Sequence, residues 1–139
     1  MDGETRAKMI EAARGALANS YAPYSGFAVG AAVLTASGDI FTGCNLENAS
    51  YPVGMCAERS ALGAAVAAGH KEIAAVAIVT RGREPCPPCG MCRQALAEFG
   101  PSMDVVMASD GGTRESTLDR LLPEGFGPAF LGRGRGRSD

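Results

Sequence analysis

The stretch Ile73–Thr80, which reads IAAVAIVT, decides the fold class of this chain. It is short, apolar and rich in β-branched residues, a pattern typical of a strand that is buried on both faces. An alanine-rich segment, 55–68, precedes it and stops at Gly69, and another segment, 89–99, follows it and stops at Gly100. Both segments have the length of helices and end at glycine, the usual helix terminator. A buried strand between two helices predicts an α/β fold.

The rest of the chain extends this alternation in both directions. Residues 3–19 place apolar side chains at helical spacing, and a short helix is expected to begin at Thr117. Two apolar stretches on either side of Ser37-Gly38-Asp39 indicate a hairpin. The expected strands are 27–35, 40–47, 73–80, 104–108 and 113–116. We therefore predict a three-layer αβα sandwich with a central mixed sheet of about five strands.

Length and charge limit the organisation of the chain and its partners. The 139 residues fit one domain, which we place at 1–131. Gly132–Asp139 is rich in glycine and arginine and lacks apolar residues, so we expect a disordered tail there. The net charge of −2 lacks the positive excess of nucleic-acid-binding domains, and only the arginines of the tail offer a weaker alternative. We expect no nucleic-acid partner.

The expected compartment is the cytoplasm. Residues 1–20 mix charged residues with alanine and lack the apolar core of a signal peptide, and no apolar run has the length of a membrane span. We therefore expect no membrane partner. In a reducing compartment, the five cysteines suggest a metal or catalysis before disulfide bonds.

Two short segments carry the chemistry, Cys-Ala-Glu-Arg at 56–59 and Pro-Cys-Gly-Met-Cys at 88–92, and each lies where an expected helix begins. Cys89 and Cys92 are three residues apart and share a helix face, and Cys56 supplies a third thiolate. A catalytic zinc site uses three protein ligands and keeps one position open. His70, the only histidine, follows the far end of the first core helix. A three-thiolate site that holds one Zn²⁺ per subunit is therefore predicted.

Two further residues beside Cys56 fit such a site. Glu58 lies in the first turn, from which its carboxylate could reach a water molecule on the metal as a general acid and base. Three thiolates leave the zinc site with a net negative charge, which weakens the Lewis acid. We hypothesise that the helix N-termini and the Arg59 guanidinium offset this charge at the sulfurs.

This pattern resembles the signature of the zinc-dependent cytosine and adenine deaminases in its all-cysteine form. Three further segments, 21–30 (YAPYSGFAVG), 43–52 (GCNLENASYP) and 126–128 (FGP), are similar to the small homotetrameric cytidine deaminases. The similarity runs from about Tyr21 to Pro128 and implies the cytidine deaminase fold. Its implied zinc ligands are Cys56, Cys89 and Cys92, with Glu58 moving protons.

The resemblance also implies the substrate site. Phe27 would stack on the pyrimidine, Asn45 and Glu47 would hold the ribose hydroxyls, and the backbone of Ala57 would meet the base O2. Tyr51 and Phe126 would cross subunit boundaries in a homotetramer. The implied reaction is hydrolysis of cytidine and 2′-deoxycytidine to the uridines and ammonia by a zinc-activated hydroxide, as in pyrimidine salvage.

Other interpretations stay open on the residues alone. A closed structural zinc site could take a fourth ligand from Cys86 or Cys44, although such a site needs no acid–base residue such as Glu58. Cys86 and Cys89 also have the spacing of a redox pair. Asn45 and Glu47 alternate along the expected strand 40–47, which alone fits a solvated face. The same fold could deaminate blasticidin S or the cytosines of nucleic acid, although the latter would favour basic and aromatic surface residues.

Overall fold

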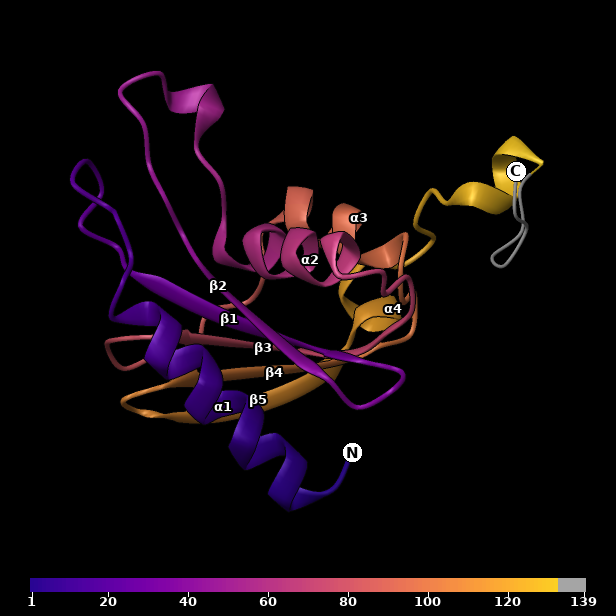
Figure 1. The fold of residues 1–139 in the computed structure, drawn as a ribbon, viewed down its shortest axis with the longest axis horizontal. Coiled ribbons are helices and arrows are strands. Elements are labelled where there is room, and N and C mark those ends of the chain that lie inside the picture. Colours follow the sequence, from indigo (N-terminus) through magenta and orange to yellow (C-terminus); the bar gives the residue numbers. More distant parts are fainter. Residues whose placement is uncertain (133–139) are drawn as a thin grey trace.

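The computed structural model describes residues 1–132, and its centre is one five-stranded sheet in the order β2-β1-β3-β4-β5 (Figure 1). The strands are β1 (Val29–Thr35), β2 (Ile40–Cys44), β3 (Ile73–Thr80), β4 (Asp104–Ser109) and β5 (Gly112–Thr117). β3 and β4 run parallel, and the other neighbours are antiparallel. The prediction of a mixed sheet and of the first hairpin is confirmed.

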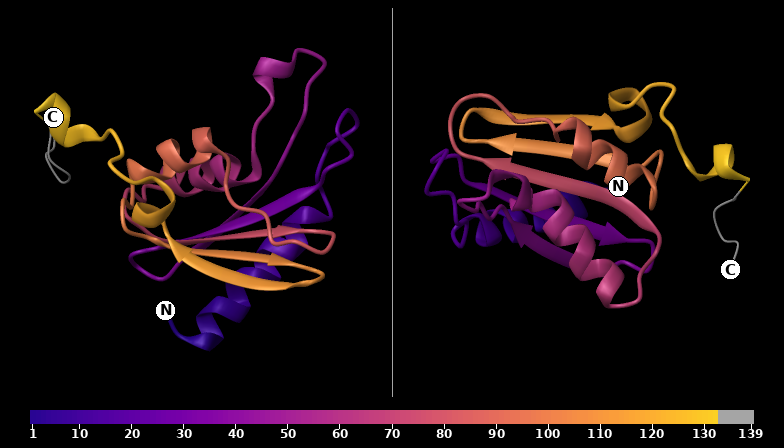
Figure 2. Two further views of the ribbon diagram at one scale, coloured as in Figure 1. Left: turned by 180° about the vertical axis from the view of Figure 1, so that it is seen from behind. Right: turned by 90° about the horizontal axis from the view of Figure 1, so that it is seen from above.

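Helices cover both faces of this sheet (Figures 1 and 2). They are α1 (Gly3–Leu17), α2 (Ala57–Ala67), α3 (Gly90–Ala97) and α4 (Leu118–Leu121), with 3-10 turns η1 (Tyr51–Val53) and η2 (Pro128–Leu131). α1 packs on one face through Met9 and Ala13, whereas α2 and α3 pack on the other through residues such as Leu62 and Leu96. The three-layer αβα arrangement is thus also confirmed.

The central strands are apolar because both of their faces are covered. In β1, Ala31 and Val33 belong to the cluster under α2, whereas Ala32 belongs to the cluster against α1. β3 divides in the same way, with Ile78 on the α2 face and Val79 on the α1 face. Alternation between two apolar clusters explains the uninterrupted hydrophobic run.

Two glycines allow the helices to approach the sheet closely. A Cβ atom built on Gly30 would lie 2.0 Å from the Ala13 carbonyl oxygen of α1. A Cβ on Gly43 would lie 2.4 Å from the Ala61 nitrogen and 2.7 Å from the Ala57 oxygen, both in α2. Gly43 therefore sets the depth at which the first turn of α2, with Glu58, rests on β2.

The second strand is shorter than predicted. β2 ends at Cys44, so Asn45 and Glu47 lie beyond it rather than alternating along it. The chain leaves β1 at this point because Tyr21 takes over the pairing: the Tyr21 N–H donates to the Asn45 carbonyl over 3.0 Å, and the Glu47 N–H donates to the Tyr21 carbonyl over 2.8 Å. These bonds join the segment before β1 to the segment that leads from β2 to the motif at Cys56.

The sequence also predicted that the chain has no membrane span and that it ends in a disordered tail. Within residues 1–132, no helix combines the length and the apolarity that crossing a bilayer requires. Gly132 closes η2 with a φ of 70°. The rest of the predicted tail, 133–139, lies outside the described residues.

Candidate metal centre and adjoining loops

Three cysteine sulfurs meet where α2 and α3 begin. The Sγ atoms of Cys56, Cys89 and Cys92 all lie within 4.8 Å of one another. Cys89 is exposed and Cys92 is fully buried, so the cluster lies at the boundary between core and surface. Among residues 1–132 neither Cys44, Cys86 nor His70 joins this cluster, which leaves three protein ligands and one open position.

The spacing of the sulfurs suits zinc. Tetrahedral zinc–sulfur bonds of about 2.3 Å separate two sulfurs by about 3.8 Å. The Sγ atoms of Cys56 and Cys89 are 3.8 Å apart. The cluster therefore accommodates one zinc ion without rearrangement of this pair.

Helix geometry explains how the two motifs reach one point. Cys56 is the N-cap residue of α2 and Cys89 is the N-cap residue of α3, and neither side chain caps its own helix. The first N–H groups of both helices therefore face the cluster without an intrahelical acceptor, and they favour negative charge there.

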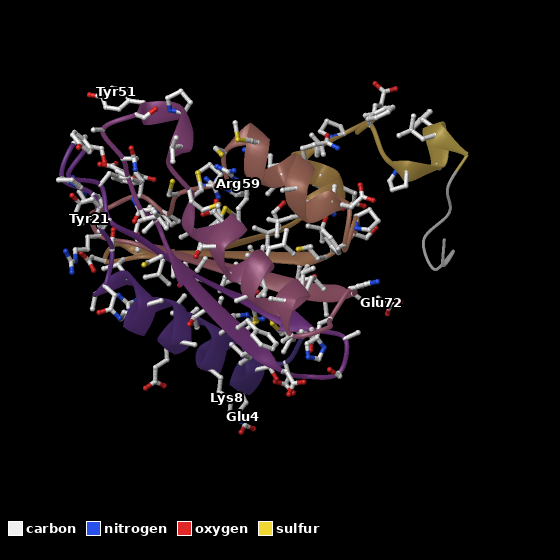
Figure 3. All side chains as sticks on the ribbon, turned by 45° about the horizontal axis from the view of Figure 1, so that its top comes forward. Glu4, Lys8, Tyr21, Tyr51, Arg59 and Glu72 are labelled. Atoms are coloured by element: carbon white, nitrogen blue, oxygen red, sulfur yellow. The ribbon has the colours of Figure 1, made fainter. Side chains whose placement is uncertain are left out.

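Hydrogen bonds to the sulfurs favour the thiolate form of Cys56. Contacts from Cys92, then from Arg59 and Cys89, lower the pKa of Cys56 to about 5 against the opposing effect of burial. Nη2 of Arg59 lies 3.8 Å from Sγ of Cys56, and this bond raises the pKa of Arg59. Figure 3 shows the labelled Arg59 beside side-chain sulfurs. The predicted contact of Arg59 with a sulfur is present.

Glu58 is buried beside the cluster. Its side chain is only 4% exposed, and burial is the main cause that raises the pKa of its carboxyl group. The negative charge of Cys56 raises this pKa further, whereas the neighbouring Cys92 side chain lowers it. Burial thus makes this carboxyl group a better proton acceptor than an exposed one, as a general acid and base requires.

Sequence reasoning missed an arginine that secures the second motif. Arg93 of α3 donates from Nε to the Pro88 carbonyl over 2.8 Å and from Nη1 to the Leu121 carbonyl over 2.7 Å. It thus joins the residue before Cys89 to the end of α4. Its position directly after Cys92 was the only sequence signal, and that signal does not reveal the two carbonyls.

Two loops rise beside the metal centre and are tied together by polar side chains. Asn45 donates from Nδ2 to the Phe27 carbonyl over 2.8 Å, and its Oδ1 accepts from the Val29 N–H over 2.9 Å and from Ser20 Oγ. The Glu47 carboxylate accepts from two backbone N–H groups in the loop before β1. These bonds place the residues that were predicted to hold ribose next to Phe27.

The aromatic side chains around these loops are exposed. Phe27 is 48% exposed and Tyr51, at the tip of the longer loop, is 75% exposed (Figure 3). Tyr51 packs edge-on against Tyr24, with ring centroids 5.7 Å apart. The segment that follows α4 extends on the side of the molecule opposite to the loop between β2 and α2 (Figures 1 and 2). Gln94 Nε2 of α3 donates to the Phe126 carbonyl in this segment over 2.9 Å. Phe126 is therefore not brought to the cluster of its own chain.

Comparison with models of protein families identifies the family to which this chain belongs. The model described as the cytidine and deoxycytidylate deaminase zinc-binding region matches residues 4–109, a span that contains both cysteine motifs and Glu58. The chain belongs to this family.

Named deaminases are similar to between two thirds and nine tenths of this chain. A cytidine deaminase of Halalkalibacterium halodurans is 42% identical over 87% of this chain and 93% of its own length. A crystal structure of cytidine deaminase from Burkholderia pseudomallei is 45% identical, covers 91% of this chain and 100% of that one, and has a TM-score of 0.83. A blasticidin-S deaminase of Bacillus cereus is 31% identical over 68% of this chain and 74% of its own length.

The deaminase family accounts for the fold and the metal. Its zinc-binding region coincides with a cluster of three thiols that fits one zinc ion. The chain is accordingly a zinc-dependent hydrolytic deaminase, and the interpretation as a closed structural site lacks a fourth ligand among the described residues. Glu58, Arg59 and Ala57 lie in the same helical turn, next to this cluster.

Proposed function

We propose that this chain hydrolyses the exocyclic amine of cytidine and 2′-deoxycytidine, with Glu58 as the proton carrier. The observation that supports this most strongly is a buried carboxyl group, that of Glu58, beside a cluster of three thiols that fits a metal ion. A structural zinc module has no need of such a group. The similarity to cytidine deaminases over most of the chain supports the same substrate class.

The chemistry divides between the metal and Glu58. A zinc ion held by Cys56, Cys89 and Cys92 would supply the Lewis acidity that lets water ionise near neutral pH. Glu58 would take a proton from that water and deliver it to N3 of the cytosine while the hydroxide adds to C4. It would then carry the proton of the new C4 hydroxyl to the amine, which leaves as ammonia. The N–H group of Ala57 is among the first of α2, which have no intrahelical acceptor, so it suits the base O2. Arg59 withdraws negative charge from the Cys56 sulfur.

The remaining hydrogen-bonding capacity of Asn45 and Glu47 suits one sugar hydroxyl. The amide of Asn45 has one N–H left after its bond to Phe27, and its oxygen is used by Ser20 and Val29. The carboxylate of Glu47 accepts three bonds, which leaves about one of about four acceptor sites. A hydroxyl can donate one bond and accept another, so this pair suits one sugar hydroxyl, and we assign it to the 3′-hydroxyl, which both cytidine and 2′-deoxycytidine carry.

We further propose that the chain forms a homotetramer in which Tyr51 and Phe126 complete the site of a neighbouring subunit. Exposed apolar residues, both in the loop that carries Tyr51 and in the C-terminal segment that carries Phe126, support this assembly because burial against another subunit would remove them from water. They include Tyr51, Val53, Met55, Met91, Phe126, Phe130 and Leu131. Molecular mass in solution, measured by light scattering, tests the assembly. Five free thiols fit the cytoplasm as its compartment, and the acidic composition fits the absence of a nucleic-acid partner.

The first experiment is an ultraviolet assay of cytidine conversion with and without a zinc chelator. We expect chelator-sensitive turnover of cytidine and 2′-deoxycytidine and poor turnover of cytidine 3′-monophosphate, whose phosphate would lie against the Glu47 carboxylate and be repelled by it. Equal rates on the monophosphate and the nucleoside would contradict the role of Glu47. Turnover of blasticidin S, without turnover of cytidine, would move the assignment to that substrate.

A further inference from the structure

Ser25 lies at the centre of the bonds that join the two loops. Its Oγ donates to Oε2 of Glu47 and accepts from the Phe27 N–H over 3.0 Å. Its own N–H donates to Oε1 of Glu47 over 3.0 Å, beside the Tyr24 N–H at 2.9 Å. One serine thus connects the carboxylate assigned to the sugar with the backbone of the residue assigned to the base.

The turn that carries Ser25 is built to present these groups. The Gly26 N–H donates to the Ala22 carbonyl over 2.9 Å, and Gly26 has a φ of 68°, a left-handed conformation that glycine adopts without strain. This closes the turn and directs the N–H groups of Tyr24 and Ser25 to Glu47. The hydrogen bonds from Ser25 and Tyr24 hold the pKa of Glu47 below its ordinary value, so the carboxylate stays charged.

Phe27 is consequently held on both sides of its backbone. Its N–H donates to Ser25 Oγ, and its carbonyl accepts from Asn45 Nδ2. The ring itself is about half exposed, so surrounding side chains do little to fix it. The orientation of the ring depends on these two polar contacts, and both lead to residues assigned to the sugar.

We propose that Ser25 is a positioning residue that couples recognition of the sugar hydroxyl at Glu47 to placement of Phe27 against the pyrimidine. This inference rests on the proposed function. A hydroxyl bound at Glu47 fixes the carboxylate, the carboxylate fixes Ser25 Oγ, and Ser25 Oγ fixes the Phe27 N–H. Ser25 touches neither the reacting atoms nor the metal cluster, so its effect falls on substrate binding.

The test is steady-state kinetics of Ser25→Ala with cytidine, 2′-deoxycytidine and 2′,3′-dideoxycytidine, the last two of which differ only in the 3′-hydroxyl. For cytidine we expect the KM to rise about tenfold, the effect of losing one hydrogen bond to a charged group, with kcat within about twofold. Because the two ends of the site are coupled, the variant and the loss of the hydroxyl should together raise KM by clearly less than the product of their separate effects. Ser25→Thr, which keeps the hydroxyl, should restore most of the affinity.

Ser50→Ala is the matched control, because Ser50 lies in the neighbouring loop and its side chain makes no capping bond. Its KM should equal that of the unchanged protein, and zinc content should be equal in all variants. An unchanged KM in Ser25→Ala, or fully multiplicative effects, would overturn the coupling. Failure of the unchanged protein to deaminate cytidine would instead overturn the proposed function.

Discussion

The metal centre and the paired loops are held in different ways. At the metal centre, Glu58 and Cys92 are buried, and their positions follow from the packing of two helix N-termini on the sheet. In the loops, Tyr24, Ser25 and Phe27 are exposed and are held by hydrogen bonds between segments about twenty residues apart. The first region is fixed by packing and the second by polar contacts that single substitutions can remove.

This difference separates chemistry from binding. Changes at the packed region should alter turnover, metal retention or folding, because its side chains cannot relax independently. Changes in the loops should alter affinity for the nucleoside and leave the metal in place.

The largest effect is expected at Glu58. Replacement by Gln keeps the size of the side chain but removes the proton carrier, so kcat should fall by about 10³-fold or more because one group serves two transfers. Zinc content, measured by atomic absorption, should remain at one ion per chain. Residual kcat within tenfold of the unchanged enzyme would assign the proton transfers to another group.

Arg93→Met should loosen the metal. The Pro88 and Leu121 carbonyls lose their donors, so the loop before Cys89 gains freedom, and zinc should leave about 10–100-fold faster. Transfer of zinc to a coloured chelator measures the rate. Arg120→Met, an exposed arginine on α4, is the control and should release zinc at the original rate. Equal rates for both variants would restrict Arg93 to a general role in folding.

Gly43→Ala should destabilise the protein, because the new Cβ would lie 2.4 Å from backbone of α2. We expect a loss of about 1–3 kcal/mol in the free energy of unfolding, measured with urea. Gly63→Ala on the exposed side of α2, where a Cβ meets nothing within 4 Å, should instead stabilise by up to about 1 kcal/mol. Similar losses in the two variants would show that the contact at Gly43 relaxes freely.

The smallest effect is expected when Glu47, which accepts the hydrogen bonds between the two loops, becomes protonated at low pH. The folded pKa of Glu47 lies below its ordinary value of 4.5, so the contribution of its bonds is complete above that value and is lost as pH falls through the folded pKa. The amide NMR signals of Tyr24 and Ser25 should therefore titrate with a midpoint below 4.5. The Ser50 amide, which donates to the neutral Asn48 side chain, should show no such step. A midpoint above the ordinary value would indicate that the loop bonds are absent in solution.

The same division explains what the sequence could predict. Cys56, Glu58, Cys89 and Cys92 lie within two short motifs at helix starts, and the resemblance to the zinc-deaminase signature predicted that the two motifs meet. The uninterrupted apolar run of β3 likewise specified a strand covered on both faces.

The contacts that hold the two loops together were harder to predict from the sequence. Asn45 and Glu47 were expected on a strand, but pairing with Tyr21 ends β2 first, and this competition between distant segments leaves no local pattern. Ser25 and Arg93 act through backbone carbonyls, carboxylates and N–H groups of other segments, so their residue types alone did not single them out.

The placement of the tyrosines gives the protein an optical property. Tyr21, Tyr24 and Tyr51 are its three tyrosines, all in or beside the paired loops, and the chain contains no tryptophan. Its intrinsic ultraviolet fluorescence therefore arises from the loop region alone and is silent about the rest of the fold. Nucleoside entry and loop rearrangement can be followed by tyrosine emission in real time, without attaching a label.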